Sequence, residues 1–177
     1  MIKGNLDKFN HKKELGFTLI ELIVVILLIS IMSVTVLPKF LTSNGFEEFT
    51  YRDELITKLR AIQLRSMQQT TDAVCKVIQV ETAPPAIIGL QRTHIDTDSG
   101  LPDGCEVGYQ GDTTTVTVDP KHSVSFTISE GLTSFSFSSL GKPIGCTPIN
   151  LCGITITVIG ENSLEILINS EGYVHAN

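Results

Sequence analysis

Residues 12–38 read KKELGFTLIELIVVILLISIMSVTVLP, and this stretch decides most of the fold. From Phe17 to Leu37 the chain is apolar apart from hydroxyl-bearing side chains and one charge, Glu21. A helix rises about 1.5 Å per residue, so a run of this length can cross a hydrocarbon core of roughly 30 Å. The sequence therefore predicts a transmembrane helix over residues 17–38.

Glu21 is the unusual residue of this run. A charged side chain in a membrane helix costs on the order of 2.5–3.5 kcal/mol on insertion scales, and such a residue normally serves a function. We therefore expect Glu21 to have a specific cationic partner.

The residues before the apolar run predict its orientation. Four lysines precede it against two acids: Lys3, Lys8, Lys12 and Lys13 against Asp7 and Glu14. By the positive-inside rule, the N-terminus stays in the cytoplasm and the remainder crosses the membrane. In a secretory signal peptide the small residues at the cut follow a shorter apolar stretch. Here Gly16 precedes the run, so cleavage after it would remove residues 1–16 and keep the helix.

The segment Gly16-Phe17-Thr18-Leu19-Ile20-Glu21 resembles the class III signal of type IV pilins and type II secretion pseudopilins. The resemblance implies that a prepilin peptidase cuts after Gly16 and methylates Phe17, and that Glu21 guides assembly into a filament. Its implied partners are that peptidase, other pilins or pseudopilins, the inner-membrane assembly platform and membrane lipid. The implied location is the inner membrane, with a periplasmic domain, and later an extracytoplasmic filament.

Residues 39–70 are predicted to form an amphipathic helix. Pro38 should kink or weaken the helix before it, and Asn44 is placed to cap a new helical start. Apolar residues then recur at spacings that put many of them on one face: Phe46, Phe49, Ile56, Leu59, Ile62 and Met67. Charged residues form the solvated face: Glu47, Arg52, Asp53, Lys58, Arg60 and Arg65. We expect this helix to cover a β-sheet; a membrane-surface helix is the alternative.

Residues 71–177 are predicted to form a periplasmic antiparallel β domain without a further helix. The candidate strands are Val74–Val80, Ala86–Leu90, Thr114–Val118, Ser123–Ile128, Thr133–Phe137, Ile154–Ile159, Leu164–Asn169 and Tyr173–His175. The turn signals between them are Pro84-Pro85, Asp119-Pro120, Glu161-Asn162 and Glu171-Gly172. The predicted fold class is therefore α+β and pilin-like, with a long N-terminal helix packed on an antiparallel sheet.

The end of the chain resembles a narrower group. The run Phe137 to Pro143, an Ile-Thr-Ile-Thr strand and the run Ile166 to Val174 are similar to H-type minor pseudopilins. They are also similar to the C-type minor pilin of mannose-sensitive haemagglutinin (MSHA) pili. These relatives often have Gly-Arg in the last turn, where this chain has Gly172-Tyr173, so a role for that arginine is not carried over.

The chain has four cysteines, all beyond the apolar run: Cys75, Cys105, Cys146 and Cys152. In the periplasm, where disulfides persist, three pairings are possible and the sequence does not choose between them. We favour Cys75 with Cys105 and Cys146 with Cys152, because neither needs a long crossing. A zinc site is the alternative; there is no C-x-x-C, and His94, His122 and His175 show no ligand spacing.

Signatures of enzymes are absent from the sequence, including G-x-S-x-G, H-E-x-x-H and the phosphate loop, so we predict neither catalysis nor a cofactor. The run Asp96-x-Asp98-x-Gly100, with Asp103 nearby, only partly resembles a calcium loop. An EF-hand needs glycine at position six and glutamate at twelve, where this chain has Leu101 and Val107. A surface turn is the favoured interpretation, and no metal is predicted.

The formal net charge is −6, and few basic residues lie beyond residue 70: Lys76, Arg92, Lys121 and Lys142. Nucleic-acid binding needs a basic stripe, so no nucleic-acid partner is expected. The sequence therefore predicts a minor pilin or pseudopilin of a type IV pilus (MSHA-like) or a type II secretion filament, with a structural role in filament assembly or initiation. The alternative is a surface-exposed binding pilin, for adhesion or DNA capture.

Overall fold

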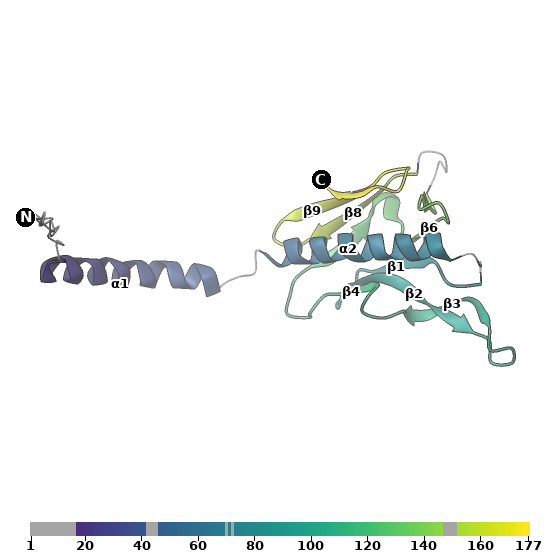
Figure 1. Ribbon diagram of the computed structural model, residues 1–177, viewed down its shortest axis with the longest axis horizontal. Helices are drawn as coiled ribbons and strands as arrows, with labels where there is room; N and C mark the ends of the chain where they lie inside the picture. Colours follow the sequence, from purple (N-terminus) through teal and green to yellow (C-terminus); the bar gives the residue numbers. More distant parts are fainter. Residues whose placement is uncertain (1–16, 42–45, 70, 72, 147–151) are drawn as a thin grey trace, which may run out of the picture. The chain divides into compact units, whose positions relative to one another are not determined.

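The computed structural model describes residues 17–41, 46–69, 71, 73–146 and 152–177, without the side chains of residues 34–41. The chain divides into two compact units, residues 1–42 and residues 43–177. The first contains helix α1, Leu19–Leu41, and the second contains helix α2, Glu47–Gln68, with the β-sheets (Figure 1). Helix α1 continues through Pro38, where the sequence predicted a kink or a weakened turn. No helix among the described residues is both long enough and apolar enough to span a membrane.

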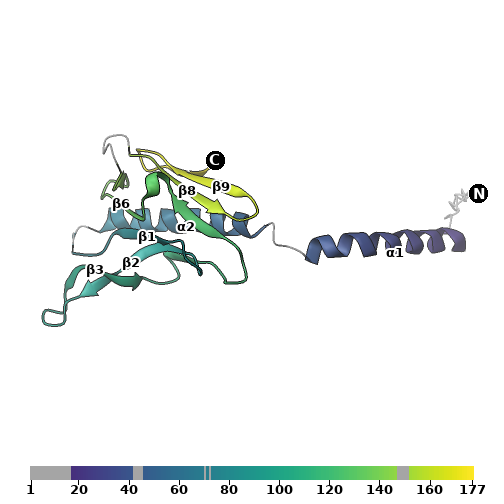
Figure 2. The same cartoon turned by 180° about the vertical axis from the view of Figure 1, so that it is seen from behind.

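The described part of the second unit contains ten strands in two antiparallel sheets. Their bounds are β1 Val77–Glu81, β2 Ile87–Ile95, β3 Pro102–Tyr109, β4 Thr115–Thr117, β5 Ser125–Ile128, β6 Ser134–Phe137, β7 Pro143–Ile144, β8 Ile154–Ile159, β9 Ser163–Ile168 and β10 Val174–Ala176. The larger sheet has the order β3-β2-β1-β6-β7, and β4 also pairs with β2. The smaller sheet has the order β10-β9-β8-β5. Figure 2 shows the same two sheets from behind.

Helix α2 packs across both sheets. It contacts β4 and β6 of the larger sheet and β8, β9 and β10 of the smaller sheet (Figure 1). Its buried residues follow spacings of three and four: Glu48, Tyr51, Leu55, Leu59, Ile62 and Ser66. They meet sheet residues such as Phe126, Phe135 and Phe137 in one core. The predicted α+β class, with a helix packed on antiparallel strands, is confirmed.

The predicted buried face of α2 is wrong at both ends of the helix. Phe46, Phe49 and Met67 are 74%, 37% and 49% exposed, whereas the first turn buries Glu48. A spacing of three and four residues fits two neighbouring stripes of this helix. The prediction selected the more apolar stripe, and at the two ends of the helix the other stripe is the buried one. Helix α2 begins at Glu47 with Phe46 at the cap position and no capping side chain. The predicted cap, Asn44, lies outside the described residues.

All eight predicted strands overlap observed strands, but β3 and β7 were not predicted. Strand β3 lies at the edge of the larger sheet and contains Pro102, Gly104 and Gly108. Its side chains alternate between half-buried and exposed, so it lacks the buried apolar residues that identify a strand. In the described chain after α2, the helical assignment is confined to the three-residue turn Ser129–Gly131.

Two disulfides link segments of this unit. Cys75 joins Cys105 across a Cα distance of 4.8 Å, and Cys146 joins Cys152 across 5.4 Å. This is the pairing that the sequence favoured. Cys105 lies in strand β3, which is one of the two strands that were not predicted from the sequence.

Candidate processing and assembly site

Helix α1 begins two residues after the predicted methylated residue. Phe17 is 84% exposed, and the predicted cut after Gly16 falls at the border of the described residues. The backbone N–H of Glu21 donates to Thr18 Oγ1 at 3.3 Å, and that of Leu22 donates to the Thr18 carbonyl at 3.2 Å. Thr18 therefore caps the helix, and Thr18 with Glu21 forms the Thr-x-x-Glu pattern of a capping box.

Thr18 was not predicted to cap the helix, although the Thr-x-x-Glu pattern before an apolar run is a known start signal of helices. Glu21 lies in the first turn of α1, where a negative charge interacts favourably with the helix dipole. Its side chain is exposed and, among the described residues, makes no hydrogen bond or ion pair. The carboxylate is therefore accessible to a partner from another molecule.

Apolar side chains cover α1 on all sides. From Leu19 to Met32, each Leu, Ile, Val and Met side chain is at least 38% exposed. The hydroxyls of Ser30 and Ser33 donate to the carbonyls of Ile26 and Ile29, at 2.6 and 2.7 Å, so their donors are satisfied within the helix. A helix that is apolar all round is typical of one buried in a membrane or inside a large assembly. The surface of α1 is therefore the candidate assembly surface.

The first turn of α2 is attached to the β8–β9 turn through Glu48. Its Oε1 atom accepts hydrogen bonds from the backbone N–H and the side-chain amide of Asn162, at 3.2 and 2.7 Å. A Cβ on Gly160 would lie 2.9 Å from Glu48 Oε2, so glycine leaves the space for this carboxylate. Burial raises the pKa of Glu48, but hydrogen bonds from Asn162 and the Glu48 backbone lower it, and the result lies below the ordinary value. Glu48 is therefore a buried carboxyl group whose Oε1 atom is held by Asn162, while its Oε2 atom has no hydrogen-bond partner among the described residues.

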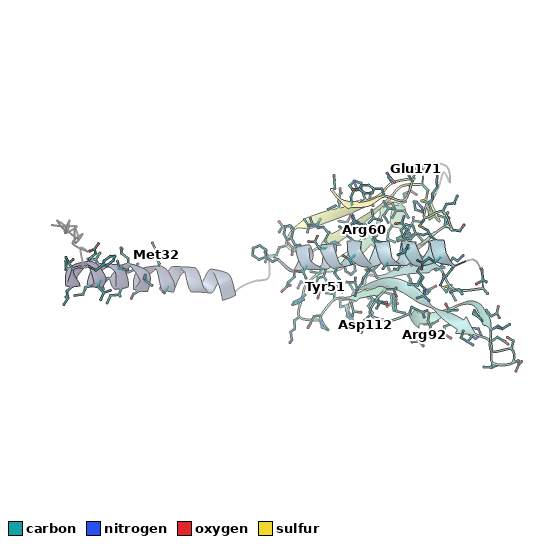
Figure 3. The ribbon with its side chains drawn as sticks, viewed as in Figure 1. Met32, Tyr51, Arg60, Arg92, Asp112 and Glu171 are labelled. Atoms are coloured by element: carbon teal, nitrogen blue, oxygen red, sulfur yellow. A yellow bond between two sulfur atoms is a disulfide. The ribbon has the colours of Figure 1, made fainter. Side chains whose placement is uncertain are left out.

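A second link joins the same end of α2 to the loop before β5. His122 Nε2 lies 3.3 Å from Glu47 Oε1, and His122 Nδ1 lies 2.8 Å from the Tyr51 hydroxyl. The backbone N–H of Asp119 donates to that hydroxyl at 3.0 Å. A neutral His122 with its proton on Nε2 satisfies all three contacts, because Nδ1 then accepts from Tyr51. Figure 3 shows Tyr51 on the side of α2 that faces β4.

Further along α2, Gln63 connects two turns of the β domain. Its Nε2 atom donates to the carbonyls of Gly141 and Gly172, each at 2.7 Å. Both glycines have positive φ, and a Cβ on Gly172 would lie 2.0 Å from the Gly141 oxygen, so these turns require glycine. Arg60 donates to the Val174 carbonyl at 2.8 Å, on the side of α2 that faces β9 (Figure 3). The run Phe137 to Pro143 and the run Ile166 to Val174 therefore meet at α2.

Comparison with known proteins identifies the N-terminal segment. A family model described as the prokaryotic N-terminal methylation motif matches residues 11–37. Two solved structures of the type IV minor pilin FimU of Pseudomonas aeruginosa strain PAO1 are similar to this chain. One has a TM-score of 0.45 at 10% identity and covers 72% of this chain and 90% of that chain. The other has a TM-score of 0.36 at 12% identity and covers 73% and 92%. A search among curated proteins gave no match.

The matched segment contains the residues on which the sequence prediction depends, Gly16, Phe17 and Glu21. Most of the matched segment lies in helix α1, whose surface is the apolar one described above. The chain therefore carries a prokaryotic N-terminal methylation motif at residues 11–37.

Proposed function

We propose that the protein is a filament subunit: a minor pilin or pseudopilin of a type IV pilus, MSHA-like, or of a type II secretion filament. The observation that carries the proposal is the surface of α1, which is apolar all round and starts within the methylation motif. Burial of apolar surface contributes about 25 cal/mol per Å². A helix with such a surface is stable in lipid or among other apolar helices, which are the two surroundings that a filament subunit passes through.

In this proposal, residues 17–38 hold the chain in the inner membrane, with the N-terminus in the cytoplasm. Residues 39–70 connect this anchor to the periplasmic domain, residues 71–177. Prepilin peptidase removes residues 1–16 and methylates Phe17, and the assembly platform then moves the subunit into a filament with other pilins. The role of the subunit is structural, in assembly or initiation of that filament.

Glu21 supplies the axial register between subunits. Cleavage creates an α-ammonium group on Phe17, whose unperturbed pKa of about 8 keeps it mostly charged at neutral pH. The exposed Glu21 carboxylate of one subunit pairs with this ammonium group of a neighbour. In apolar surroundings an unpaired charge is costly, so the pair favours one relative position of the two helices.

Mass spectrometry of the protein from sheared filaments and from membranes tests the proposal. The filament form should begin at Phe17 and carry an N-methyl group. A Gly16→Leu variant serves as the control, because it should keep its leader, remain in the membrane fraction and be absent from filaments. Wild-type protein that keeps its leader in filaments, or is cut after the apolar run, would contradict the proposal.

A further inference from the structure

The phenylalanines of the second unit fall into a buried group and an exposed group. The three in the sheets, Phe126, Phe135 and Phe137, are at most 2% exposed. Phe46 and Phe49, at the start of α2, are 74% and 37% exposed, and their ring centroids lie 6.5 Å apart. Single exposed apolar residues are normal on protein surfaces, but neighbouring exposed aromatic rings are typical of a contact surface.

Arg52 extends this surface by one more turn. Its guanidinium carbon lies 5.5 Å from the centroid of the Phe49 ring, within the range of a cation–π interaction. Its charge is balanced by Asp53, at 2.8 Å. Phe46, Phe49 and Arg52 are three residues apart and therefore lie on one side of the helix; we call them the aromatic stripe.

The two carboxylates of the first turn of α2 are engaged away from the aromatic stripe. Glu47 pairs with His122, and Glu48 is buried against Asn162. The stripe therefore exposes two rings beside a charge-balanced guanidinium whose side chain is 20% exposed. This composition is apolar at one end and polar at the other, as a membrane–water interface requires.

The aromatic stripe follows α1 closely in the sequence. Helix α1 ends at Leu41 and Phe46 follows five residues later, a distance of at most about 18 Å for a fully extended chain. The sequence between the apolar run and the stripe also contains Lys39 and Phe40. Aromatic and basic residues directly after an apolar helix are typical of the membrane–water interface, where rings lie at headgroup level and cations reach the phosphates.

We propose that the aromatic stripe binds the phospholipid headgroup layer of the membrane that holds α1. The inference rests on the proposed function, because it requires α1 to be embedded in lipid. The rings of Phe46 and Phe49 lie at the glycerol level, and Arg52 contacts lipid phosphate. This contact holds the first turn of α2, and the domain packed on it, at the membrane surface until the subunit leaves for the filament.

Tryptophan fluorescence can test this contact, since the chain has no tryptophan of its own. Ile29→Trp, Phe46→Trp and Leu140→Trp variants of the full chain would each be reconstituted in phosphatidylcholine liposomes with brominated lipids of defined bromine depth. Leu140 is the matched control, because it is 75% exposed and precedes Gly141, whose added Cβ would lie 3.0 Å from Met67 in the last turn of α2. Helix α2 has 22 residues and is about 33 Å long, so the probes at residues 46 and 140 report on opposite ends of it.

The expected result is an ordered pattern of quenching. Bromine near the headgroups should quench Phe46→Trp several-fold more than Leu140→Trp, and deep bromine should quench Ile29→Trp most. A Phe49→Trp variant should be quenched like Phe46→Trp, which would show that the result does not depend on the substitution at one position. An Arg52→Gln change in the Phe46→Trp variant should reduce the quenching, since the phosphate contact is lost.

The other outcomes separate the inference from the proposed function. Quenching of Ile29→Trp without quenching of Phe46→Trp and Phe49→Trp would overturn the lipid contact and leave the membrane anchor intact. Lack of quenching of Ile29→Trp would overturn the anchor itself. Blue-shifted emission of Phe46→Trp without quenching by any brominated lipid would identify a protein contact at the stripe and would also overturn the inference.

Discussion

Helices α1 and α2 are almost equal in length, at 23 and 22 residues, but their side chains are arranged in opposite ways. Helix α1 exposes apolar side chains on all sides, whereas α2 buries one face against two sheets and keeps each of its charged side chains except Glu48 half-buried or exposed. The stability of α2 therefore comes from its own domain, and the partner of α1 must come from outside that domain. In the proposed filament subunit, this difference would let the folded domain stay intact while the N-terminal helix changes surroundings.

Substitutions in the two helices should therefore affect different measurements. Changes in the buried face of α2 should lower the free energy of unfolding of the domain. Changes in α1 should leave that free energy unchanged and affect membrane anchoring or filament assembly.

Leu59→Ala should give the largest loss of stability. Leu59 is fully buried in the middle of α2, and truncation of such a residue costs about 2–5 kcal/mol through lost transfer energy and the cavity left behind. The matched substitution in α1 is Ile26→Ala, where the side chain is 52% exposed and the domain should unfold as the wild type does. Urea unfolding in detergent, followed by circular dichroism, measures both. Equal destabilisation by the two substitutions would contradict the division between the helices.

Loss of the disulfide between Cys75 and Cys105 should come next. This disulfide joins residues 30 positions apart, and closing a loop of that size stabilises a protein by about 2–4 kcal/mol. The double variant Cys75→Ser/Cys105→Ser should lose about that amount and still assemble through α1. Non-reducing peptide mapping of periplasmic protein, with urea unfolding, checks the pairing and the loss. Free thiols or bound zinc in the wild-type protein would contradict this prediction.

Glu48→Gln should have a smaller and pH-dependent effect. Glutamine keeps an acceptor oxygen for the two hydrogen bonds from Asn162 but removes the charge, and hydrogen bonds to charged groups contribute about 1.5–3 kcal/mol against about 0.5–1.5 for neutral ones. The pKa of Glu48 is lowered in the folded state, so its contribution is present above the ordinary value of 4.5 and is lost as the pH falls below it. The Glu48→Gln variant should therefore have a lower free energy of unfolding than wild type at pH 7. That free energy should also change less than in wild type as the pH is lowered. Glu161 is exposed in the same β8–β9 turn and provides the control. The free energy of unfolding of Glu161→Gln should depend on pH as that of the wild type does.

The features that could be predicted from the sequence are those encoded locally. The processing signal and the apolar run lie within residues 12–38, and the alternation in β8 shows its buried face directly. The disulfide partners were favoured by closeness in sequence. The capping role of Thr18 could also have been predicted, because Glu21, whose backbone N–H it accepts, lies only three positions later.

The features that could not be predicted depend on partners far away in the sequence. Glu48 is buried because Asn162, 114 residues later, supplies its hydrogen bonds. Gln63 acts through carbonyls 78 and 109 residues away. The apolar pattern placed Phe46 on the buried face, but Phe46 is exposed and Glu48 is buried, because tertiary contacts override the simple pattern. Strand β3 was missed because an edge strand needs little buried apolar surface.

Glu21→Val should have the smallest effect on unfolding, because Glu21 lies in α1 and the domain does not depend on it. Its effect should appear in the filament. The variant should be cleaved after Gly16 and anchored at least as well as wild type, since valine is more favourable in lipid than a carboxylate. Its amount in sheared filaments, relative to the membrane fraction, should fall. Wild-type amounts in filaments, with cleavage confirmed by mass spectrometry, would refute the role of Glu21 in register.

A fall in assembly alone does not yet identify the role of the charge, because Thr18 bonds to the backbone of Glu21 at the start of α1. A capping box works with glutamine as well as with glutamate, so Glu21→Gln keeps the local pattern and removes only the charge. If the cap is what assembly needs, Glu21→Gln should assemble like wild type and only Glu21→Val should fail. If the carboxylate pairs with the Phe17 ammonium group of a neighbour, both variants should fail to the same degree. We expect the second result, because a cap could be formed without placing a charge in an apolar helix, and the cost of that charge is offset only by a cationic partner.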